Sequence, residues 1–575
     1  MAFMVSPGVN VREIDLTNVI PAVSTSIGAV AGFFNWGPVK EIVTVNSEKT
    51  LVNRFGEPDN NTAPYFMPAA QFLQYANTLR VVRAEIDGMV NANVDGNGIL
   101  VRNADSYDQV AFGVDGNEFV AKYPGEIGNS IQVFLVTNAT SFQDLETLGI
   151  SGVLDFAPST SPYAAERGAL NDEVHVIVVD EGGNITGTRG SILEVFQGLS
   201  QASDAKDLSG SSNYYKDVIN SRSRFVWVGN TPVSLPNAGE KTTSTNLLPE
   251  SDGNSFVTDD QLLVYSLSGG SNGNLNEPSL GELIDAYDMF EDSDTVDVNF
   301  LISVGVSEAD DVPFANYLAD LATIRRDAVA FISPSVSRSI NAIDNAVATS
   351  NVLNWAEEIT STSYAVMDSG AVYVYDKYND EFRWIVAAGD VAGLCANTDS
   401  VADPWFSPAG LNRGQLRGVS RLAYNPTQTD RDELYKGRVN PLVSFPGEGT
   451  ILFGDKTALA RASAFDRINV RRLFIVLQKA IATAAKFQLF ELNDEFTQAQ
   501  FRNLVEPFLR DVQGRRGITD FLVVCDETNN TPEVVDTNRF VADIYIKPAR
   551  SINFITLSFI AVRTGVEFDE IAGQS

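Results

Sequence analysis

The stretch SIGAVAGFFNWGPVKEIVTV, residues 26–45, indicates the fold class of this 575-residue chain. It reads as an apolar segment, a turn at Gly37-Pro38 and a second segment rich in β-branched residues, which is typical of two strands joined by a turn. The next stretch, YFMPAAQFLQYANTLRVVRA, predicts a helix that leads into a short strand at Leu79–Arg83. Strands followed by a helix and a further strand predict a mixed sheet in an α/β domain.

The same alternation of strands and amphipathic helices continues through residues 173–306 and 312–424. Residues 87–162 differ, because they are rich in Asn, Asp and Gly and contain only short apolar runs, which favours a small β-rich insertion. Residues 425–575 predict a long apolar helix, a second helix and late strands. The chain is therefore predicted to be a multi-domain protein of mixed α/β (α+β) class.

A short strand without a neighbouring partner is predicted near the N-terminus, in PGVNVREIDL. Val9 and Val11 alternate with polar residues, and the apolar phase then shifts to Ile14 and Leu16. An isolated strand cannot pair its own backbone donors and acceptors. We therefore expect its partner to lie elsewhere.

A second strand is predicted close to the C-terminus, in SINFITLSFIAV. Phe554 and Val562 fall on one face of that strand, and Leu557 and Phe559 fall on the other. A strand that is apolar on both faces is expected inside a sheet, flanked on both edges.

Composition narrows the range of functions. Hydrophobic residues make up 44% and charged residues 20%, values typical of a soluble protein, but the formal charge is −33. Such an acidic chain is a poor match for nucleic acid or anionic lipid, which both need clustered Lys and Arg. No run of about 20 apolar residues predicts a membrane span, and the N-terminus does not resemble a secretory signal, so we expect a cytosolic site of synthesis and use.

Few residues suited to catalysis or metal binding are present. The only two cysteines, Cys395 and Cys525, lie far apart in sequence, and the single histidine, His175, lies within an apolar run that predicts a buried strand. Disulfide frameworks, CxxC zinc sites and histidine-based nucleophilic catalysis are therefore not expected. We predict no catalytic residue, no metal and no cofactor.

One stretch, FPGEGTILFGDKT, resembles a phosphate-binding loop. Gly449 and Gly454 have the required spacing and Lys456-Thr457 follow, but Asp455 stands where that motif needs lysine. A carboxylate repels phosphate, so a strand between two glycine turns is favoured over a nucleotide site.

A basic stripe is predicted on the helix that begins near residue 468. Arg472, Lys479 and Lys486 recur every seven residues on an otherwise apolar helix, and seven residues make almost two turns. In so acidic a chain, this favours a docking face for an acidic partner, and the alternative is a helix edge whose cations extend into water.

Ten motifs, taken together in order and spacing, resemble the contractile tail sheath proteins of long-tailed bacteriophages, and the T4-like phages in particular. The resemblance covers most of the chain. The motifs are PGVNVREID, GAVAGFFNWGP, Phe55-Gly56, AKYPGEIGNSIQV, SSNYYKDVINSRS, DPWFSPAGLNRG, FPGEGTILFGDKT, INVRRLFIVLQKAI, FELND and FLVVCDETNN.

The resemblance implies a structural subunit that forms stacked hexameric rings around an inner tail tube and contracts to drive the tube through the host envelope. The partners it implies are further copies of the chain, the tail tube protein, and baseplate and tail terminator proteins. It also implies assembly in the host cytoplasm, strand exchange between subunits through the terminal arms, and no nucleotide consumption. With the sequence pattern, it makes the basic stripe a candidate tube-facing surface.

The resemblance also implies an inner core built from N- and C-terminal segments, with inserted domains projecting outward. The predicted segments are an exchange arm at 1–23, a discontinuous sheath core at 24–86 and 336–424, an inserted β-rich outer domain at 87–165, an α/β middle domain at 166–335, and a tube-facing C-terminal domain at 425–575.

Three alternatives remain at this point. The chain could be the sheath of a phage-derived injection device or bacteriocin, and genomic context separates that from a phage. It could be a nucleotide-binding enzyme built around Gly449–Thr457. Residues 87–162 could add a receptor-binding or glycan-binding surface.

Overall fold

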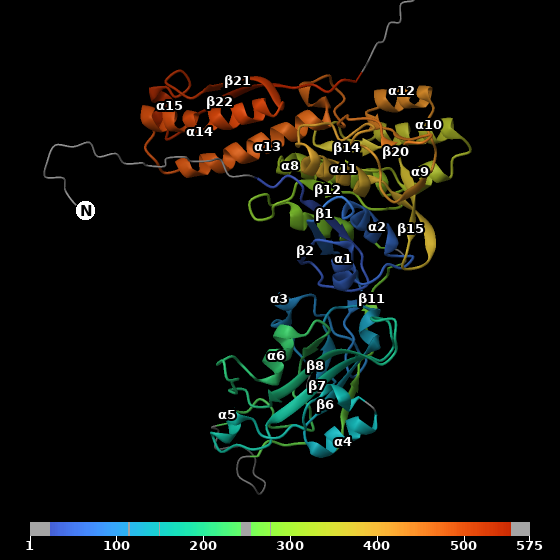
Figure 1. Ribbon diagram of the computed structural model, residues 1–575, viewed down its shortest axis with the longest axis vertical. Helices are drawn as coiled ribbons and strands as arrows, with labels where there is room; N and C mark the ends of the chain where they lie inside the picture. The colour runs from blue at the N-terminus through green and yellow to red at the C-terminus, as the bar shows by residue number, and fades with distance from the viewer. Residues whose placement is uncertain (1–22, 113–115, 149, 243–254, 276–277, 554–575) are drawn as a thin grey trace, which may run out of the picture. The chain divides into compact units, whose positions relative to one another are not determined.

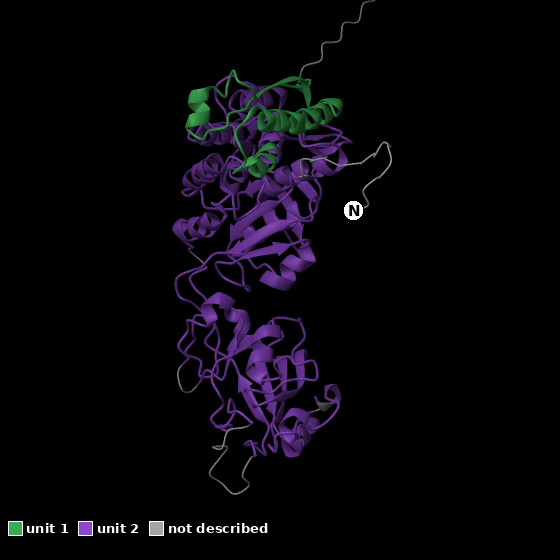
Figure 2. Cartoon of the chain, turned by 90° about the vertical axis from the view of Figure 1, so that its left-hand side faces the viewer, with its two compact units in different colours: residues 1–21, 405–407, 481–575 green, residues 22–404, 408–480 purple. Residues whose placement is uncertain are grey.

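The computed structural model describes most of the chain in five stretches. They are residues 23–112, 116–148, 150–242, 255–275 and 278–553. The described residues fall into two compact units, which Figure 2 colours separately. The larger unit holds residues 23–404 and 408–480, and the smaller holds residues 405–407 and 481–553.

A seven-stranded sheet forms the core of the larger unit (Figure 1), in the order β18-β14-β13-β12-β1-β3-β2. All neighbours in it pair in parallel except β2, which is antiparallel to β3. Its strands are β1 Gly28–Gly32, β2 Ile42–Val45, β3 Leu79–Arg83, β12 Phe300–Ile302, β13 Val329–Ile332, β14 Ala365–Asp368 and β18 Val439–Asn440. The opening stretch of the sequence thus forms β1 and β2 as predicted, and the mixed α/β class is confirmed.

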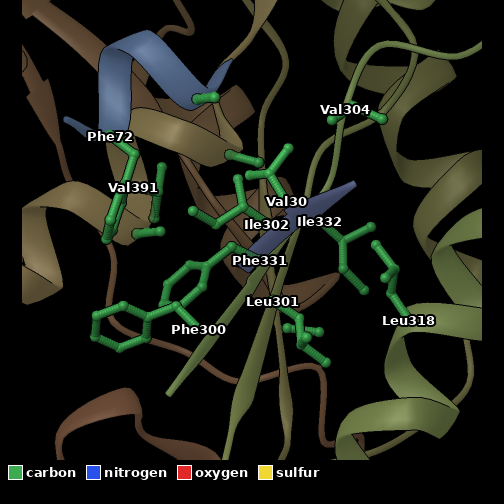
Figure 3. Close-up of a cluster of buried hydrophobic side chains, with 14 of the residues drawn as sticks. Val30, Phe72, Phe300, Leu301, Ile302, Val304, Leu318, Phe331, Ile332 and Val391 are labelled. Atoms are coloured by element: carbon green, nitrogen blue, oxygen red, sulfur yellow. The ribbon is translucent and has the colours of Figure 1, made fainter. Parts of the chain in front are cut away.

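Helices cover both faces of this sheet. Helices α2 (Ala63–Phe72) and α11 (Ala388–Val401) pack on one face, and α7 (Leu280–Tyr287) and α8 (Asp311–Arg325) pack on the other. Figure 3 shows the result: Phe72 and Val391 lie on one side of the strands and Leu318 lies on the other. Burial on both faces explains why these strands read as continuous apolar runs.

The two glycines of β1 allow helix α2 to lie close to the sheet. A Cβ on Gly28 would stand 2.7 Å from the Phe72 ring, and one on Gly32 would stand 2.6 Å from the Tyr65 Cβ. Both distances are shorter than any carbon–carbon contact, so the GAVAG pattern is a packing requirement of this strand.

The remaining helices of the larger unit are mostly short and begin at polar caps. Ser47, for example, accepts a hydrogen bond from the Thr50 N–H, and Asn138 forms a reciprocal capping box with Ser141. These helices are α1 Glu48–Phe55, α3 Ala104–Tyr107, α4 Ala139–Thr147, α5 Pro162–Ala165, α6 Tyr215–Arg222, α9 Val336–Ile340, α10 Asn345–Glu357, α12 Gln428–Lys436 and α13 Ile468–Ala485, which continues into the smaller unit. Short 3₁₀ helices of the larger unit lie at Glu126–Ser130, Ser151–Val153, Asp288–Phe290 and Ala464–Asp466, and one of the smaller unit lies at Lys486–Gln488.

An inserted lobe lies between β3 and α7 in sequence. Its centre is an antiparallel sheet in the order β10-β6-β7-β8, and the chain enters and leaves the lobe through β4 and β11, which pair with each other. The strands are β4 Met89–Val90, β5 Phe119–Ala121, β6 Ile131–Val136, β7 Glu173–Asp180, β8 Ser191–Ser200, β9 Val226–Val228, β10 Leu263–Ser266 and β11 Ser271–Asn272.

Three of the predicted domain boundaries need correction. The boundary at 165/166 separates β6 from β7, although β6 pairs with β7 along its whole length. The boundary at 335/336 assigns β12 and β13 to a middle domain, although both pair within the core sheet. The boundary at 424/425 likewise separates β18 from β14. In each case the partner strand is distant in sequence, so local composition does not reveal the pairing.

Two small antiparallel sheets complete the larger unit. One has the order β16-β15-β17 and the other joins β19 to β20. Their strands are β15 Ala371–Asp376, β16 Glu381–Val386, β17 Val419–Leu422, β19 Leu442–Phe445 and β20 Gly449–Leu452.

The smaller unit is a helix packed on a two-stranded sheet. Helix α14 (Glu495–Gly514) buries Phe501, Val505 and Leu509 and packs against β21. Its other elements are β21 Ile518–Val524, α15 Pro532–Asp536 and β22 Asp543–Pro548. Among the described residues of both units, none of the helices is long and apolar enough for a membrane span.

Candidate interaction surfaces

Arg472 is buried and fully engaged inside the larger unit. Its Nη2 donates to both carboxylate oxygens of Asp399, at 2.6 and 2.7 Å, and its guanidinium also donates to the carbonyls of Cys395 and Thr25 at 3.2 and 3.3 Å. The Arg472 side chain is 4% exposed and that of Asp399 is 7% exposed. The prediction that Arg472 faces a partner surface is therefore corrected, because this cation joins α13 to the end of α11.

The other two members of the predicted stripe differ from Arg472. Lys479 forms an ion pair with Asp297 and keeps 20% of its side chain exposed. Lys486, in the smaller unit, is exposed. The three cations of the seven-residue spacing therefore differ in their surroundings: Arg472 is buried, Lys479 is partly exposed and Lys486 is exposed.

The smaller unit presents a sheet with open edges. Strands β21 and β22 pair antiparallel, from Ile518 opposite Pro548 to Val524 opposite Asp543. Within the described residues, no third strand pairs with either of them. An isolated pair of strands is marginally stable in water, and an unpaired edge is a ready template for a further strand.

The residues predicted to form the two terminal strands lie outside the described part of the chain. They are Val9, Val11, Ile14 and Leu16 in the N-terminal stretch, and Phe554, Leu557, Phe559 and Val562 at the C-terminal end.

The loop that resembles a phosphate-binding motif is a β-hairpin followed by an internal ion pair. Gly449 begins β20, which pairs antiparallel with β19, and Asp455 lies 3.3 Å from the Arg467 guanidinium. The Lys456 Nζ donates to the carbonyl of Tyr435 at 2.6 Å. The lysine next to the position that the motif requires is thus held by the protein's own backbone, as expected for a structural turn.

His175 has a structural position on β7. It is fully buried, its Nδ1 accepts from the Gly198 N–H at 2.9 Å, and its Nε2 therefore donates to the Phe156 carbonyl at 2.9 Å. The described residues also contain no group of three or more His, Cys, Asp or Glu side chains placed to hold a metal ion.

Two carboxyl groups lie buried beside the core sheet. Asp368 ends β14 and accepts from the Ser333 hydroxyl and, at 2.9 Å, from the Gly370 N–H. Asp390, in the first turn of α11, accepts from the Tyr75 hydroxyl at 3.0 Å, and its Oδ2 has no donor among the described residues. The pKa of each carboxyl is raised to about 7, mainly by burial, and for Asp390 the charge of the nearby Asp368 contributes to this rise.

Replacing Asp390→Asn is expected to stabilise the chain at alkaline pH. The folded-state pKa of Asp390 lies above its unfolded value of about 3.9, so folding retains a proton and stability falls as pH rises from about 4 to 7. Asparagine keeps the acceptor for Tyr75 and carries no charge, so the gain should approach zero at pH 4 and reach on the order of 3 kcal/mol at pH 8. Melting temperatures across this range measure it.

The control variant is Asp320→Asn, which also removes one carboxyl group, but at an exposed position. It is expected to leave the melting temperature nearly unchanged at each pH. A gain for Asp390→Asn that stays constant from pH 4 to pH 8 would contradict the burial argument.

Sequence reasoning missed the acidic partners of the helix cations. Asp399 lies 73 positions before Arg472 and Asp297 lies 182 positions before Lys479. A usable signal was present for Arg472, because the pair Arg471-Arg472 stands between the apolar Val470 and Leu473 on a helix that is apolar almost all round. A cation in such surroundings needs an internal counter-charge.

Sequence comparison matches three domain families in order along the chain. Residues 25–84 match the description "Tail sheath protein Gp18 domain III N-terminal region", residues 279–458 match "Phage tail sheath protein central domain", and residues 461–561 match "Phage tail sheath C-terminal domain". The first two matches flank the inserted lobe and together contain every strand of the seven-stranded sheet.

Whole-chain relatives cover almost the full length. The chain is 34% identical to the tail sheath protein of Vibrio phage KVP40, over 99% of this chain and 100% of that protein. It is also 34% identical to the tail sheath protein of Enterobacteria phage T4, over 99% of both chains, and 32% identical to that of Salmonella phage ViI.

Solved structures of similar fold are also sheath proteins by name. A sheath tail protein from Listeria innocua aligns with a TM-score of 0.53 over 92% of this chain and 93% of that chain, at 12% identity. One from Desulfitobacterium hafniense gives a TM-score of 0.51 over 94% and 100%, also at 12% identity. The contracted helical sheath of the anti-feeding prophage gives 0.50 over 97% and 99%, at 13% identity. From its matched domains and its whole-length relatives, the chain belongs to the phage tail sheath protein family.

Proposed function

We propose that this chain is the subunit of a contractile phage tail sheath, which polymerises as stacked hexameric rings around the inner tail tube and contracts to drive the tube through the host envelope. The observation that carries the proposal is the 34% identity to phage tail sheath proteins over 99% of the chain. Work in this scheme comes from relaxation of the assembly, so no catalytic residue is assigned.

Strand addition between subunits is proposed as the durable link of the assembly. The open edges of β21 and β22 offer backbone donors and acceptors, and the N-terminal stretch VNVREIDL has the apolar alternation of a strand without a local partner. Each added backbone hydrogen bond contributes on the order of 1 kcal/mol net, so several together join two subunits firmly. Such bonds can survive rotation of the bodies that they connect.

Contacts with the tail tube are proposed to be weaker and electrostatic. Exposed ion pairs contribute less than about 1 kcal/mol each, which suits a surface that must release the tube. With Arg472 buried, the tube-facing role is assigned to exposed Lys486 and partly exposed Lys479. Baseplate and tail terminator proteins are the proposed partners at the two ends of the polymer.

The proposed location is the tail of a virion assembled in the host cytoplasm. A sheath of a phage-derived injection device is the second candidate, because the helical sheath of the anti-feeding prophage shares the fold. A capsid gene and a packaging gene beside the coding sequence favour the phage, and their absence favours the device.

Negative-stain electron microscopy of the purified, overexpressed chain tests the proposed function. Hollow, cross-striated tubes are the expected result. If the chain remains monomeric at every concentration that can be reached, self-assembly is contradicted. If calorimetry shows that the chain binds a nucleoside triphosphate, the purely structural role is contradicted.

A further inference from the structure

The sheet β16-β15-β17 has one buried face and one exposed face. On the central strand, Val372 and Val374 are fully buried, whereas Tyr373 and Tyr375 point to the opposite side. Tyr375 is 47% exposed, and Phe382 on the neighbouring strand is 48% exposed.

Four aromatic side chains and one arginine form this exposed surface, which we name the aromatic face. It consists of Tyr373, Tyr375, Phe382, Trp384 and Arg421. The register places Trp384 and Arg421 on either side of Tyr373, so these three residues form one row across the strands. Tyr375 and Phe382 form the next row.

The members of the aromatic face are in close contact. The Tyr373 ring centroid lies 4.5 Å from that of Trp384, and the Arg421 Cζ lies 4.5 Å from the Tyr373 centroid. Phe382 stacks on Tyr373 at 5.3 Å with an angle of 15° between the rings. Cross-strand pairing of this kind stabilises a hairpin by itself. It does not explain why the rings of Tyr375 and Phe382 remain about half exposed to solvent.

The composition of the aromatic face is that of a binding hot spot. Tyr, Trp and Arg are the residues enriched where interfaces gain most of their affinity, and rigid aromatic side chains lose little conformational freedom on binding. The rings are already held by one another, so a partner would meet a pre-ordered surface.

The aromatic face carries one exposed cation, Arg421, and borders one carboxylate, because the Tyr375 hydroxyl donates to Asp380 at 2.6 Å. Arg421 is exposed, and no carboxylate of the described residues lies within 4.0 Å of its guanidinium. The whole chain carries 74 acidic and 41 basic residues, so a second copy presents a mainly acidic surface. A single unpaired cation is too little for a phosphate backbone or an anionic membrane, which both need several.

We propose that the aromatic face docks an acidic segment of a second copy of this chain, with a carboxylate on Arg421 and an apolar side chain against Tyr375 and Phe382. The proposal rests on the self-assembly given under the proposed function and adds a contact that is separate from the strand exchange in the smaller unit. This contact is made by side chains alone, so it can form and break without any change in the backbone pairing of the sheet.

Photo-crosslinking tests the identity of the partner. The full chain carries p-benzoylphenylalanine in place of Phe382, is assembled and is then illuminated. The expected product is a covalent dimer whose crosslinked peptide, found by mass spectrometry, is rich in Asp and Glu. Crosslinks confined to one chain, or to another protein when tail components are present, would overturn the proposal.

Charge reversal at Arg421 tests the strength of the contact. Arg421→Glu is expected to raise the critical concentration for assembly by about tenfold or more, and Arg421→Lys, which keeps the charge but not the planar stacking, by an intermediate factor. The matched control is Arg222→Glu, an equal change on an exposed helix end of the inserted lobe, which should leave the critical concentration unchanged.

The two proposals fail in different ways. If the unmodified chain does not assemble, the proposed function fails. If it assembles and Arg421→Glu assembles at the same concentration with the same melting temperature, only the aromatic-face contact is overturned. If Arg421→Glu does not fold, the crosslink at Phe382, where Arg421 is intact, decides alone.

Discussion

A chain that lacks residues 1–20 is expected to fold and stay soluble but to form no tubes. We expect both units to keep their sheets and buried clusters without this stretch, because the strand pairings and apolar clusters described above join residues of 23–553 to one another. The open edges of β21 and β22 would lose the strand proposed to join them from a neighbouring subunit. With several backbone hydrogen bonds of about 1 kcal/mol lost at every link of a polymer, assembly should be abolished rather than weakened.

Substitutions within the N-terminal stretch separate strand addition from other roles of these residues. Val9→Asp with Val11→Asp, on the apolar side of the predicted strand, should abolish tubes as the deletion does. Asn10→Ser with Arg12→Ser, on its polar side, should assemble like the unmodified chain. Sedimentation and electron microscopy report the polymer, and circular dichroism reports the fold. Normal tubes from the truncated chain would disprove the strand-addition proposal.

Arg472→Ala is expected to destabilise the larger unit by about 3–5 kcal/mol, the usual cost of removing one partner from a buried ion pair. The Asp399 side chain is only 7% exposed, so the substitution leaves a buried carboxylate without its cationic partner. It also leaves the carbonyls of Cys395 and Thr25 without the hydrogen bonds that Arg472 donates. Burial alone lowers the pKa of Arg472, but Asp399 more than offsets this, so the guanidinium stays charged. A lower melting temperature at a fixed scan rate measures the effect.

Two further variants test the origin of this loss. Lys486→Ala removes the exposed cation of the same stripe and should change stability by less than about 0.5 kcal/mol. Arg472→Met combined with Asp399→Leu leaves no unpaired buried charge and should recover much of the stability lost in Arg472→Ala. If the double variant is as unstable as the single one, the ion pair is not the cause.

The local elements of the core could be predicted from the sequence because their patterns are complete within a few residues. The strand at 28–32, the turn at Gly37-Pro38 and the strand at Leu79–Arg83 all follow from short runs of apolar and turn-forming residues. The order of strands could not be predicted, because β1 lies between β12 and β3 and β12 is about 270 positions away.

The same limit applies to the candidate interaction surfaces. A heptad spacing places Arg472, Lys479 and Lys486 in line on a helix, but it carries no information on which side the rest of the fold covers. Asp399 and Asp297 decide that, and both belong to other parts of the chain. The aromatic face does have a local signal in AVYVYD and EFRWIV, two alternating strands whose aromatic positions face each other.

The pairing of β4 with β11 makes the inserted lobe a natural site for exchange of protein modules. Met89–Val90 and Ser271–Asn272 are neighbouring antiparallel strands, so the two ends of the lobe lie about 5 Å apart. A tight two-residue turn can span that distance, and so can the adjacent termini of an unrelated domain. An engineered polymer could therefore display a cargo enzyme or an antigen at this position on every subunit, with the seven-stranded sheet left intact.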